Sequence, residues 1–139
     1  MPKSAADVAV RMLMGKGQTM APQKYPSSPL VRRGEWPKGH AFVPPGEGRR
    51  PGVALMEWEL RGESWTDEHP HDEFNYVLEG HLFIACDRET VEAVTGDVVR
   101  VPAGSVGRYW APEYARMLAV YAPNPQGLES RTHAYTRLE

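Results

Sequence analysis

Four residues of types that commonly bind metal ions alternate in one short stretch: Asp67, His69, His71 and Glu73. In an extended strand, residues two apart point to the same face, so these side chains can share one side of the chain even if Pro70 bends it. Two imidazoles with one or two carboxylates suit Fe, Mn, Ni, Co or Zn. The sequence therefore predicts a divalent transition-metal site formed by His69, His71 and Glu73, with Asp67 as an optional fourth ligand.

A tyrosine further along the chain is a weaker candidate for chemistry. Tyr109 follows Gly107 by two residues within a strand-like segment, so both positions share one face and the tyrosine is expected to point inward. Such a residue can act as a general acid or can be a hydrogen-bonded aromatic of the core. The structural role is favoured, which leaves Tyr109 a weak catalytic candidate.

A series of short strands must position these residues. In residues 53–60 apolar side chains alternate with glutamates, which is the pattern of a half-buried strand. Short strands at close spacing, separated by Gly, Pro and Asp, indicate a sandwich or a barrel. Further strands are predicted at 74–78, 82–86, 91–94, 98–101, 106–110 and 115–121, with a turn or bulge at 79–80.

The first part of the chain has a different composition. Residues 4–14 have the pattern of a short helix with Ser4 as its N-cap. From there to Pro51 the chain is dense in Pro and Gly, which disfavours helices and central strands and indicates an extended arm, edge strand and loop. We therefore expect an N-terminal arm over residues 1–51 and a barrel over residues 52–139.

Two spaced motifs in the barrel segment resemble those of the cupin superfamily. Glu73 is separated from Gly80 by six residues, as in the first cupin motif, and Gly96 precedes Pro102-Ala103-Gly104 with the five-residue spacing of the second. The resemblance covers residues 52–123. It implies an all-β fold, the double-stranded β-helix or jelly-roll barrel of RmlC-like cupins.

Within that superfamily, residues 72–124 are most similar to the ethanolamine-utilization cupins. The strings Pro112-Glu113-Tyr114-Ala115-Arg116 and Tyr121-Ala122-Pro123 contribute to this similarity. No Gly-rich phosphate loop of the Walker type accompanies it.

The sequence departs from the cupin motifs at two positions. Counted back from Glu73, the two motif histidines fall on Asp67 and His69, and the histidine of the second motif falls on Gly107, which offers no ligand. His71 is an additional imidazole. A metal-free barrel is therefore the alternative to a metal site.

A second register was weighed for the first motif. If His69 and His71 were the two motif histidines, Asn75 would take the glutamate position, and the spacing to Gly80 would be too short. The register through Glu73 is therefore preferred.

The composition limits the compartment and the partners. Cys86 is the only cysteine, which excludes an intrachain disulfide and gives no sign of an oxidising compartment. No apolar run approaches the ~20 residues of a membrane span, and the first residues do not lead into a signal peptide. We expect a cytoplasmic protein without a membrane partner. The formal net charge of −2 gives no reason to expect a nucleic-acid partner.

Charge is distributed unevenly along the chain. Residues 1–50 have a balance of +6 and the remainder −8, so docking of the arm on a barrel brings opposite charges together. The arm also carries apolar residues that it cannot bury within itself. We predict a homodimer in which the arm packs on the partner's barrel, with packing on its own barrel as the alternative that the sequence does not distinguish.

Three functional interpretations follow, and they leave open whether the protein is an enzyme. The first is a cupin with a divalent metal at the barrel mouth that acts on a small organic molecule as an oxygenase, isomerase, decarboxylase or lyase. The second is a metal-free, non-catalytic cupin that binds a ligand or serves as an accessory protein. The third is an ethanolamine-utilization-like protein with a microcompartment partner or a phosphoryl-transfer activity.

Overall fold

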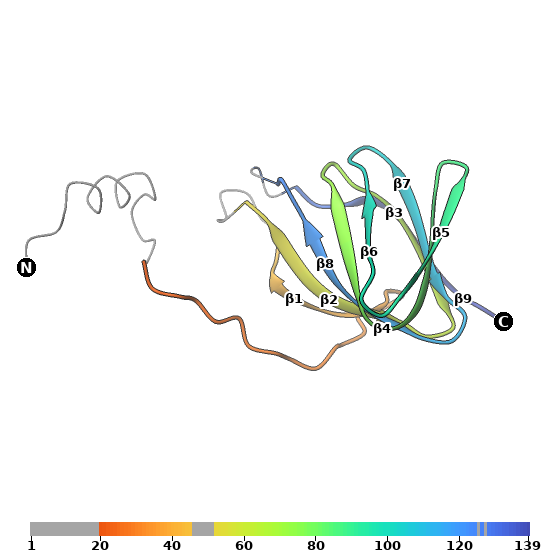
Figure 1. Ribbon diagram of the computed structural model, residues 1–139, viewed down its shortest axis with the longest axis horizontal. Coiled ribbons are helices and arrows are strands. Elements are labelled where there is room, and N and C mark those ends of the chain that lie inside the picture. The colour runs from red at the N-terminus through yellow and green to blue at the C-terminus, as the bar shows by residue number, and fades with distance from the viewer. Residues whose placement is uncertain (1–19, 46–51, 125, 127) are drawn as a thin grey trace, which may run out of the picture.

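Antiparallel strands make up the regular structure of the chain (Figure 1). The computed structural model describes residues 20–45, 52–124, 126 and 128–139, and these residues contain strands but no helix. The helix predicted at 4–14 lies outside the described residues. The strands are β1 (Lys38–Val43), β2 (Ala54–Leu60), β3 (Glu63–Glu68), β4 (Glu73–Cys86), β5 (Glu89–Val94), β6 (Val98–Val101), β7 (Val106–Ala111), β8 (Ala115–Tyr121) and β9 (Arg131–Arg137).

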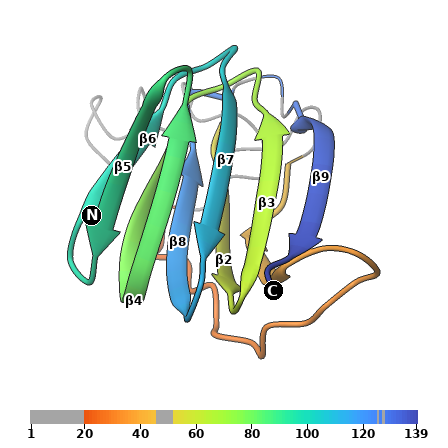
Figure 2. The same ribbon diagram turned by 90° about the vertical axis from the view of Figure 1, so that its right-hand side faces the viewer.

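Strand β4 joins two sheets into one curled barrel. Its first half pairs with β8 and β6, and its second half pairs with β7 and β5. The strand order across the whole is β1-β2-β8-β4-β7-β3-β9, and Figure 2 shows β4, β7, β3 and β9 side by side in this curled surface. The predicted all-β jelly-roll barrel with an extended N-terminal arm is confirmed.

Most of the expected strands form where the apolar pattern placed them. Strands β6 and β8 have the predicted bounds, whereas segments 74–78 and 82–86 are a single strand, β4. The expected irregularity at 79–80 is a bulge, because the pairing of β4 with β8 shifts register between Val77 and Glu79. Gly80 has a φ of 89° there, which is backbone that glycine adopts most easily.

Two strands were not anticipated. Strand β3 has the sequence Glu-Ser-Trp-Thr-Asp-Glu, and strand β9 is also largely polar. Glu63, Ser64 and Asp67 are nevertheless buried. An apolar alternation is the usual sign of a strand, and β3 lacks it because several of its buried residues are polar.

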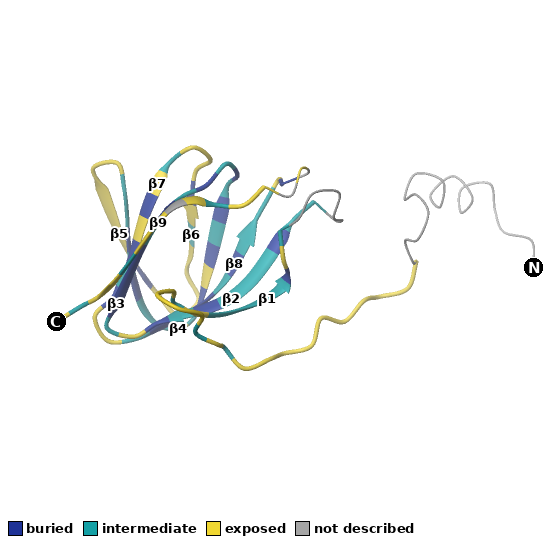
Figure 3. Cartoon of the chain, turned by 180° about the vertical axis from the view of Figure 1, so that it is seen from behind, coloured by how far each residue is buried: buried dark blue, intermediate teal, exposed yellow. Residues whose placement is uncertain are grey.

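The apolar core lies between the two sheets. It combines Leu60 and Met117 from one sheet with Leu82 and Ile84 from the other, all at most 1% exposed. Burial alternates along the strands, as the dark bands in Figure 3 show. Burying each of these side chains contributes about 1.5–3 kcal/mol, so the barrel has the apolar packing that it needs to hold a polar site rigidly.

Part of the arm packs on its own barrel. Strand β1 pairs with β2, and Val31 forms an isolated bridge with Gly39. The ring of Trp36 lies 4.7 Å from that of Trp65 in β3. Residues 20–29 are exposed and run away from the barrel (Figures 1 and 3). Residues 31–43 of the arm therefore pack on their own barrel.

Candidate metal centre and ligand cavity

The connection between β3 and β4 carries the candidate ligands. Asp67 lies near the end of β3, His69 and His71 follow in the loop, and Glu73 begins β4. The chain leaves the strand after Glu68, so the four residues are not on one continuous strand. All four are nevertheless buried.

The second motif holds this loop in place from outside. Asp72 accepts hydrogen bonds from the Ala103 amide at 2.8 Å and from Arg100 Nε at 2.8 Å. The Gly104 amide donates to the His69 carbonyl at 2.7 Å. These bonds tie the two motif loops to each other, which fixes the backbone that carries the candidate ligands.

Three donor atoms converge inside the barrel. His69 Nε2 lies 2.7 Å from Asp67 Oδ1 and 2.6 Å from Glu73 Oε2. The donor atoms of these three residues all lie within 4.8 Å of one another. Of the four ligands predicted from the sequence, the structure brings Asp67, His69 and Glu73 together.

His71 lies beside this group and not in it. Its ring stacks on that of His69 with centroids 5.6 Å apart and meets the Tyr121 ring at 4.9 Å. It also lines the cavity described below. Its position suits contact with a small molecule next to the three converging residues.

Several buried polar atoms of this group lack a hydrogen-bond partner. Among the described residues, Asp67 Oδ1, both ring nitrogens of His69 and Nδ1 of His71 have none. The oxygens near His69 Nε2 are close, but they are not aligned for a hydrogen bond. Unpartnered buried polar atoms are rare, and imidazole and carboxylate groups are common ligands of divalent transition metals. The donor set and its geometry therefore fit a divalent cation.

Hydrogen bonds from surrounding residues orient the two carboxylates. Trp65 Nε1 donates to Asp67 Oδ2 at 3.0 Å, and Asn75 Nδ2 donates to Glu73 Oε1 at 2.7 Å. Trp58 Nε1 in turn donates to Asn75 Oδ1 at 2.8 Å. Such outer contacts position metal ligands in known sites. Neither Asn75 nor Trp65 was predicted to take part in the site, because these residue types alone carry no specific signal.

Tyr109 occupies the space that a side chain at position 107 would need. A Cβ atom on Gly107 would lie 2.9 Å from the Tyr109 hydroxyl oxygen. That hydroxyl donates to Glu73 Oε2 at 2.9 Å, and Tyr109 is fully buried. The second motif therefore contributes a hydrogen bond to Glu73 where the family pattern has a histidine.

Burial and charge shift the titration of the group. Burial alone would lower the pKa of His69, but its contacts with Asp67 and Glu73 outweigh this and raise that pKa to about 10. Burial raises the pKa of Asp67. Burial and the neighbouring His69 charge lower the pKa of His71, which is therefore neutral near pH 7. Burial and the nearby carboxylates keep the pKa of Tyr109 well above its ordinary value, so it remains a proton donor.

A cavity of about 410 Å³ opens onto these residues. Asp67, His71 and Glu73 lie on its polar side, while three tryptophans provide aromatic walls. The arm supplies one of these tryptophans, Trp36, so the cavity is built jointly by arm and barrel. Its other lining residues include Arg33, Pro37, Gly39, Ala41, Pro45, Ala54, Met56, Trp58, Trp65, Tyr121, Leu128, Glu129, Ser130 and His133.

The remaining histidines differ in their surroundings. His81 pairs with Glu92 and stacks on Phe83, away from the cavity. His133 lines the cavity and stacks on Trp65 at 5.4 Å, although its position in the sequence carries no signal of this role. Strand β9 was not anticipated, so His133 could not be placed from the sequence.

Comparison with known families supports this description of the barrel. Residues 39–126 match the family described as "Ethanolamine utilisation protein EutQ". The curated protein "Acetate kinase EutQ" of Clostridioides difficile is 35% identical over 77 residues, which are 55% of this chain and 48% of that protein. The protein of the same name from Salmonella typhimurium is 34% identical over 77 residues and is covered to 33%. The chain thus spans about half or less of these relatives.

Solved structures agree with the fold. The crystal structure of a Salmonella typhimurium protein described as a putative ethanolamine utilization protein Q has a TM-score of 0.56 and 28% identity, over 63% of this chain and 69% of that one. Ectoine synthase from P. lautus has a TM-score of 0.58 at 18% identity, covers 68% of both chains and shares the fold alone. In the described part of the chain, no helix is long and apolar enough to cross a membrane. With most of the barrel matched, the chain belongs to the EutQ family of cupins.

Proposed function

We propose that this cupin binds a divalent metal ion through Asp67, His69 and Glu73 and acts on a small organic molecule in the adjoining cavity. The observation that carries the proposal is the convergence of His69 Nε2 with one oxygen from each carboxylate, at 2.6–2.7 Å and without aligned hydrogen bonds. One imidazole and two carboxylates suit Fe, Mn, Co, Ni or Zn, and the set leaves coordination positions for a ligand.

Charge balance supports a cation at this place. Two carboxylates buried side by side repel each other and need a compensating positive charge. A proton on His69 supplies one such charge, in line with its raised pKa. A divalent ion supplies more and requires His69 to release that proton, because metal ligands bind in their deprotonated form.

The residues around the group have separate tasks in this proposal. A bound metal would polarise an oxygen of the ligand or activate a bound water. Tyr109 holds Glu73 through its hydrogen bond and keeps the carboxylate turned toward His69. His71 is neutral and lines the cavity, so it can accept a proton from a ligand. The tryptophan walls offer apolar surface to a ligand in the same space.

Phosphoryl transfer is the first reaction to examine. The specific support is the match of 77 residues to curated proteins named acetate kinase, which share 34–35% identity with this chain. Enzymes of phosphoryl transfer commonly hold divalent cations against phosphate oxygens. Arg33 at the cavity and a metal at its floor would together provide positive charge for such a substrate.

A metal-free barrel is the competing account. In it, protonated His69 would neutralise Asp67 and Glu73 as a closed ionic group, and the cavity would bind a ligand without catalysis. This account explains the charges, but the hydrogen bonds that would close the group are not aligned, so Asp67 Oδ1 and His69 Nε2 have no hydrogen-bond partner among the described residues. The metal account is favoured because it uses Asp67 Oδ1.

Metal uptake and activity test the proposal together. The protein is stripped with chelator and offered Mn, Fe, Co, Ni and Zn in turn, and bound metal is measured after dialysis. We expect one equivalent per chain, lost in Asp67→Asn and His69→Gln but kept in the control His81→Gln. Formation of acetyl phosphate from ATP and acetate is then followed with and without metal. Failure to retain any of the five metals contradicts the metal site, whereas retained metal without turnover contradicts only the kinase reaction.

A further inference from the structure

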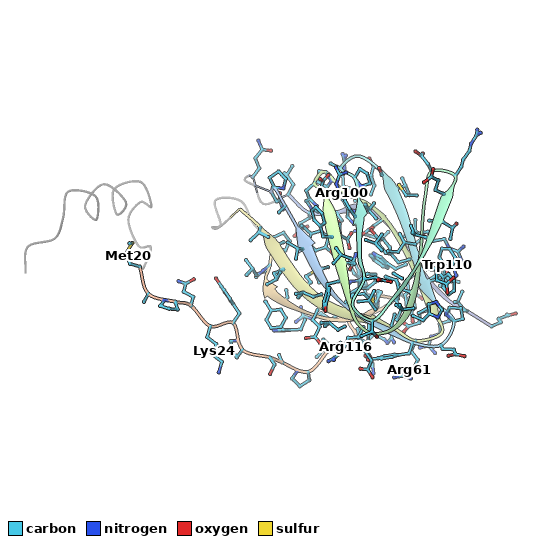
Figure 4. All side chains as sticks on the ribbon, viewed as in Figure 1. Met20, Lys24, Arg61, Arg100, Trp110 and Arg116 are labelled. Atoms are coloured by element: carbon cyan, nitrogen blue, oxygen red, sulfur yellow. The ribbon has the colours of Figure 1, made fainter. Side chains whose placement is uncertain are left out.

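A second cleft opens at the other end of the barrel. Its volume is about 310 Å³. Glu63, which lines it, begins β3, whereas Asp67 of the metal centre lies near the end of that strand. Figure 4 shows this separation: Arg61 of the cleft lies at the lower end of the barrel and Arg100, next to the ligand loop, at the upper end. The cleft is therefore distinct from the metal cavity.

Positive charge gathers in this cleft. Four cationic residues line it against two carboxylates, Glu59 and Glu63. Glu63 is already engaged by Arg32 at 2.7 Å, and Glu59 accepts a hydrogen bond from the Tyr114 hydroxyl at 2.9 Å. This local surplus of positive charge contrasts with the net negative charge of the barrel segment as a whole. The four cationic residues are Arg32, Lys38, Arg61 and Arg137.

Three of these cations lack a carboxylate partner. Within the part of the chain that the structure describes, no ion pair involves Lys38, Arg61 or Arg137. Arg61 lies over the Tyr114 ring at 4.2 Å, which leaves the outer edge of its guanidinium accessible. Surface cations commonly point apart into solvent, but here they surround one cavity.

A fixed guanidinium forms the floor of the cleft. The two N–H groups of Arg32 Nη1 are shared among three oxygens: Glu63 Oε2 at 2.7 Å, the Tyr135 hydroxyl at 2.8 Å and the Trp36 carbonyl at 2.8 Å. All hydrogen bonds of this side chain among the described residues go through Nη1. The Nη2 and Nε groups are left to donate to a ligand, and their position is already set by the three bonds. Such preorganisation reduces the entropy lost on binding.

We propose that this cleft binds a small polyvalent oxyanion, such as the phosphate group of a small molecule, between Arg32 and the rim residues Lys38, Arg61 and Arg137. Guanidinium groups offer paired donors that match phosphate oxygens. The local surplus of two positive charges corresponds to the charge of a phosphate monoester. A cleft of about 310 Å³ accepts the phosphate together with a small organic part.

Inorganic phosphate is the direct probe for this site. Full-length protein is titrated with phosphate while backbone amide shifts are followed by NMR, with acetate as the singly charged comparison. We expect saturable shifts at Lys38, Gly62 and Arg137, and weaker effects from acetate. The variant pair Lys38→Ala and Arg137→Ala should lower phosphate affinity at least about tenfold, since each phosphate contact of this kind adds charge-assisted binding.

A matched pair of variants distinguishes phosphate binding in the cleft from a general effect of removing positive charge. Arg88→Ala with Arg108→Ala removes two exposed arginines that do not line the cleft and should leave phosphate affinity unchanged. If the first pair is unstable in a thermal melt, Arg61→Met alone provides a second test. Absence of saturable binding overturns the proposal. So does equal affinity in both pairs, or shifts confined to the metal cavity.

Discussion

At the scale of single residues, Tyr109 connects the second motif to the candidate metal centre through its hydrogen bond to Glu73. We expect Tyr109→Phe to weaken metal binding by about tenfold, because the Glu73 carboxylate loses the hydrogen bond that orients it. The ring remains in place, so the free energy of unfolding should fall by only about 1 kcal/mol. Competition with a fluorescent chelator measures the affinity, and thermal melts measure the stability.

Tyr114→Phe is the control for this change. It also removes a tyrosine hydroxyl that donates to a glutamate, Glu59, but that pair lies outside the metal centre. Metal affinity should therefore be unchanged. Equal affinity in both variants and the original protein would mean that Tyr109 does not position Glu73.

Glu63 is a residue whose charge links the arm to the barrel. Its burial alone would raise its pKa, but hydrogen bonds from Arg32 and Tyr135 outweigh burial and lower the pKa overall. A lowered folded-state pKa adds stability above the unfolded-state value of about 4.3, and that stability is lost as pH falls through the lower folded-state value. We expect Glu63→Gln to flatten this acid-side loss in denaturant titrations between about pH 5 and 2. If the stability of Glu63→Gln depended on pH in the same way as that of the original protein, the contact of Glu63 with Arg32 would not contribute to stability as proposed.

At the scale of elements, the bulge in β4 makes a specific demand on the sequence. A Cβ atom on Gly80 would lie 2.2 Å from the Tyr114 carbonyl oxygen, whereas at Gly96, which also has a positive φ of 97°, nothing lies within 4 Å. Gly96→Ala should cost about 1–2 kcal/mol for the backbone alone. Gly80→Ala should cost more, because the backbone of Tyr114 must also move. Denaturant unfolding of both variants checks this order, and an equal loss would mean that the contact with Tyr114 is relieved without strain.

The sequence predicted the elements that have strong periodic patterns. Segments such as 98–101 and 115–121 are short, closely spaced apolar runs separated by turn residues, which predicted strands of a sandwich or a barrel. The choice of a jelly-roll barrel came from the resemblance to the cupin motifs. Strand β3 was not predicted because two of its buried residues, Glu63 and Asp67, are polar and break the apolar alternation. Strand β9 was not predicted because its sequence is largely polar, and His133 could not be placed without it.

The candidate site was only partly visible in the sequence. Asp67, His69 and Glu73 are of metal-binding types at a recognisable spacing, and the structure brings them together. His71 shares that spacing, but it lies in the loop after β3, where strand alternation no longer sets its direction. The roles of Asn75 and Trp36 depend on contacts between distant segments, which the types of single residues do not reveal.

At the scale of the whole molecule, the arm remains the natural place for contact with a second copy. Residues 20–29 are exposed and extend away from the barrel, with apolar side chains at Met20 and Tyr25. We predict that the full chain is a homodimer. Deleting residues 1–29 should yield a monomer, because the deletion removes the apolar side chains that would contact the second copy. Light scattering at micromolar concentration measures both masses.

The truncated chain also shows whether the deletion affects association alone or disturbs the barrel as well. It keeps Val31, Arg32 and Trp36, so the barrel should stay folded by circular dichroism and should still take up metal. A truncated protein that remains a dimer would show that the arm does not mediate association. A monomeric full chain would remove the dimer altogether.

Anomalous X-ray diffraction from crystals grown with Mn, Co or Zn tests the central claim most directly. The proposal predicts one anomalous peak per chain, within about 2.0–2.3 Å of His69 Nε2, Asp67 Oδ1 and Glu73 Oε2, because these are bonding distances for such ions. The same peak should be missing from crystals of Glu73→Gln. An ordered site with no anomalous peak, or a peak bound by His71 or His133 and not by these three atoms, would contradict the proposed metal centre.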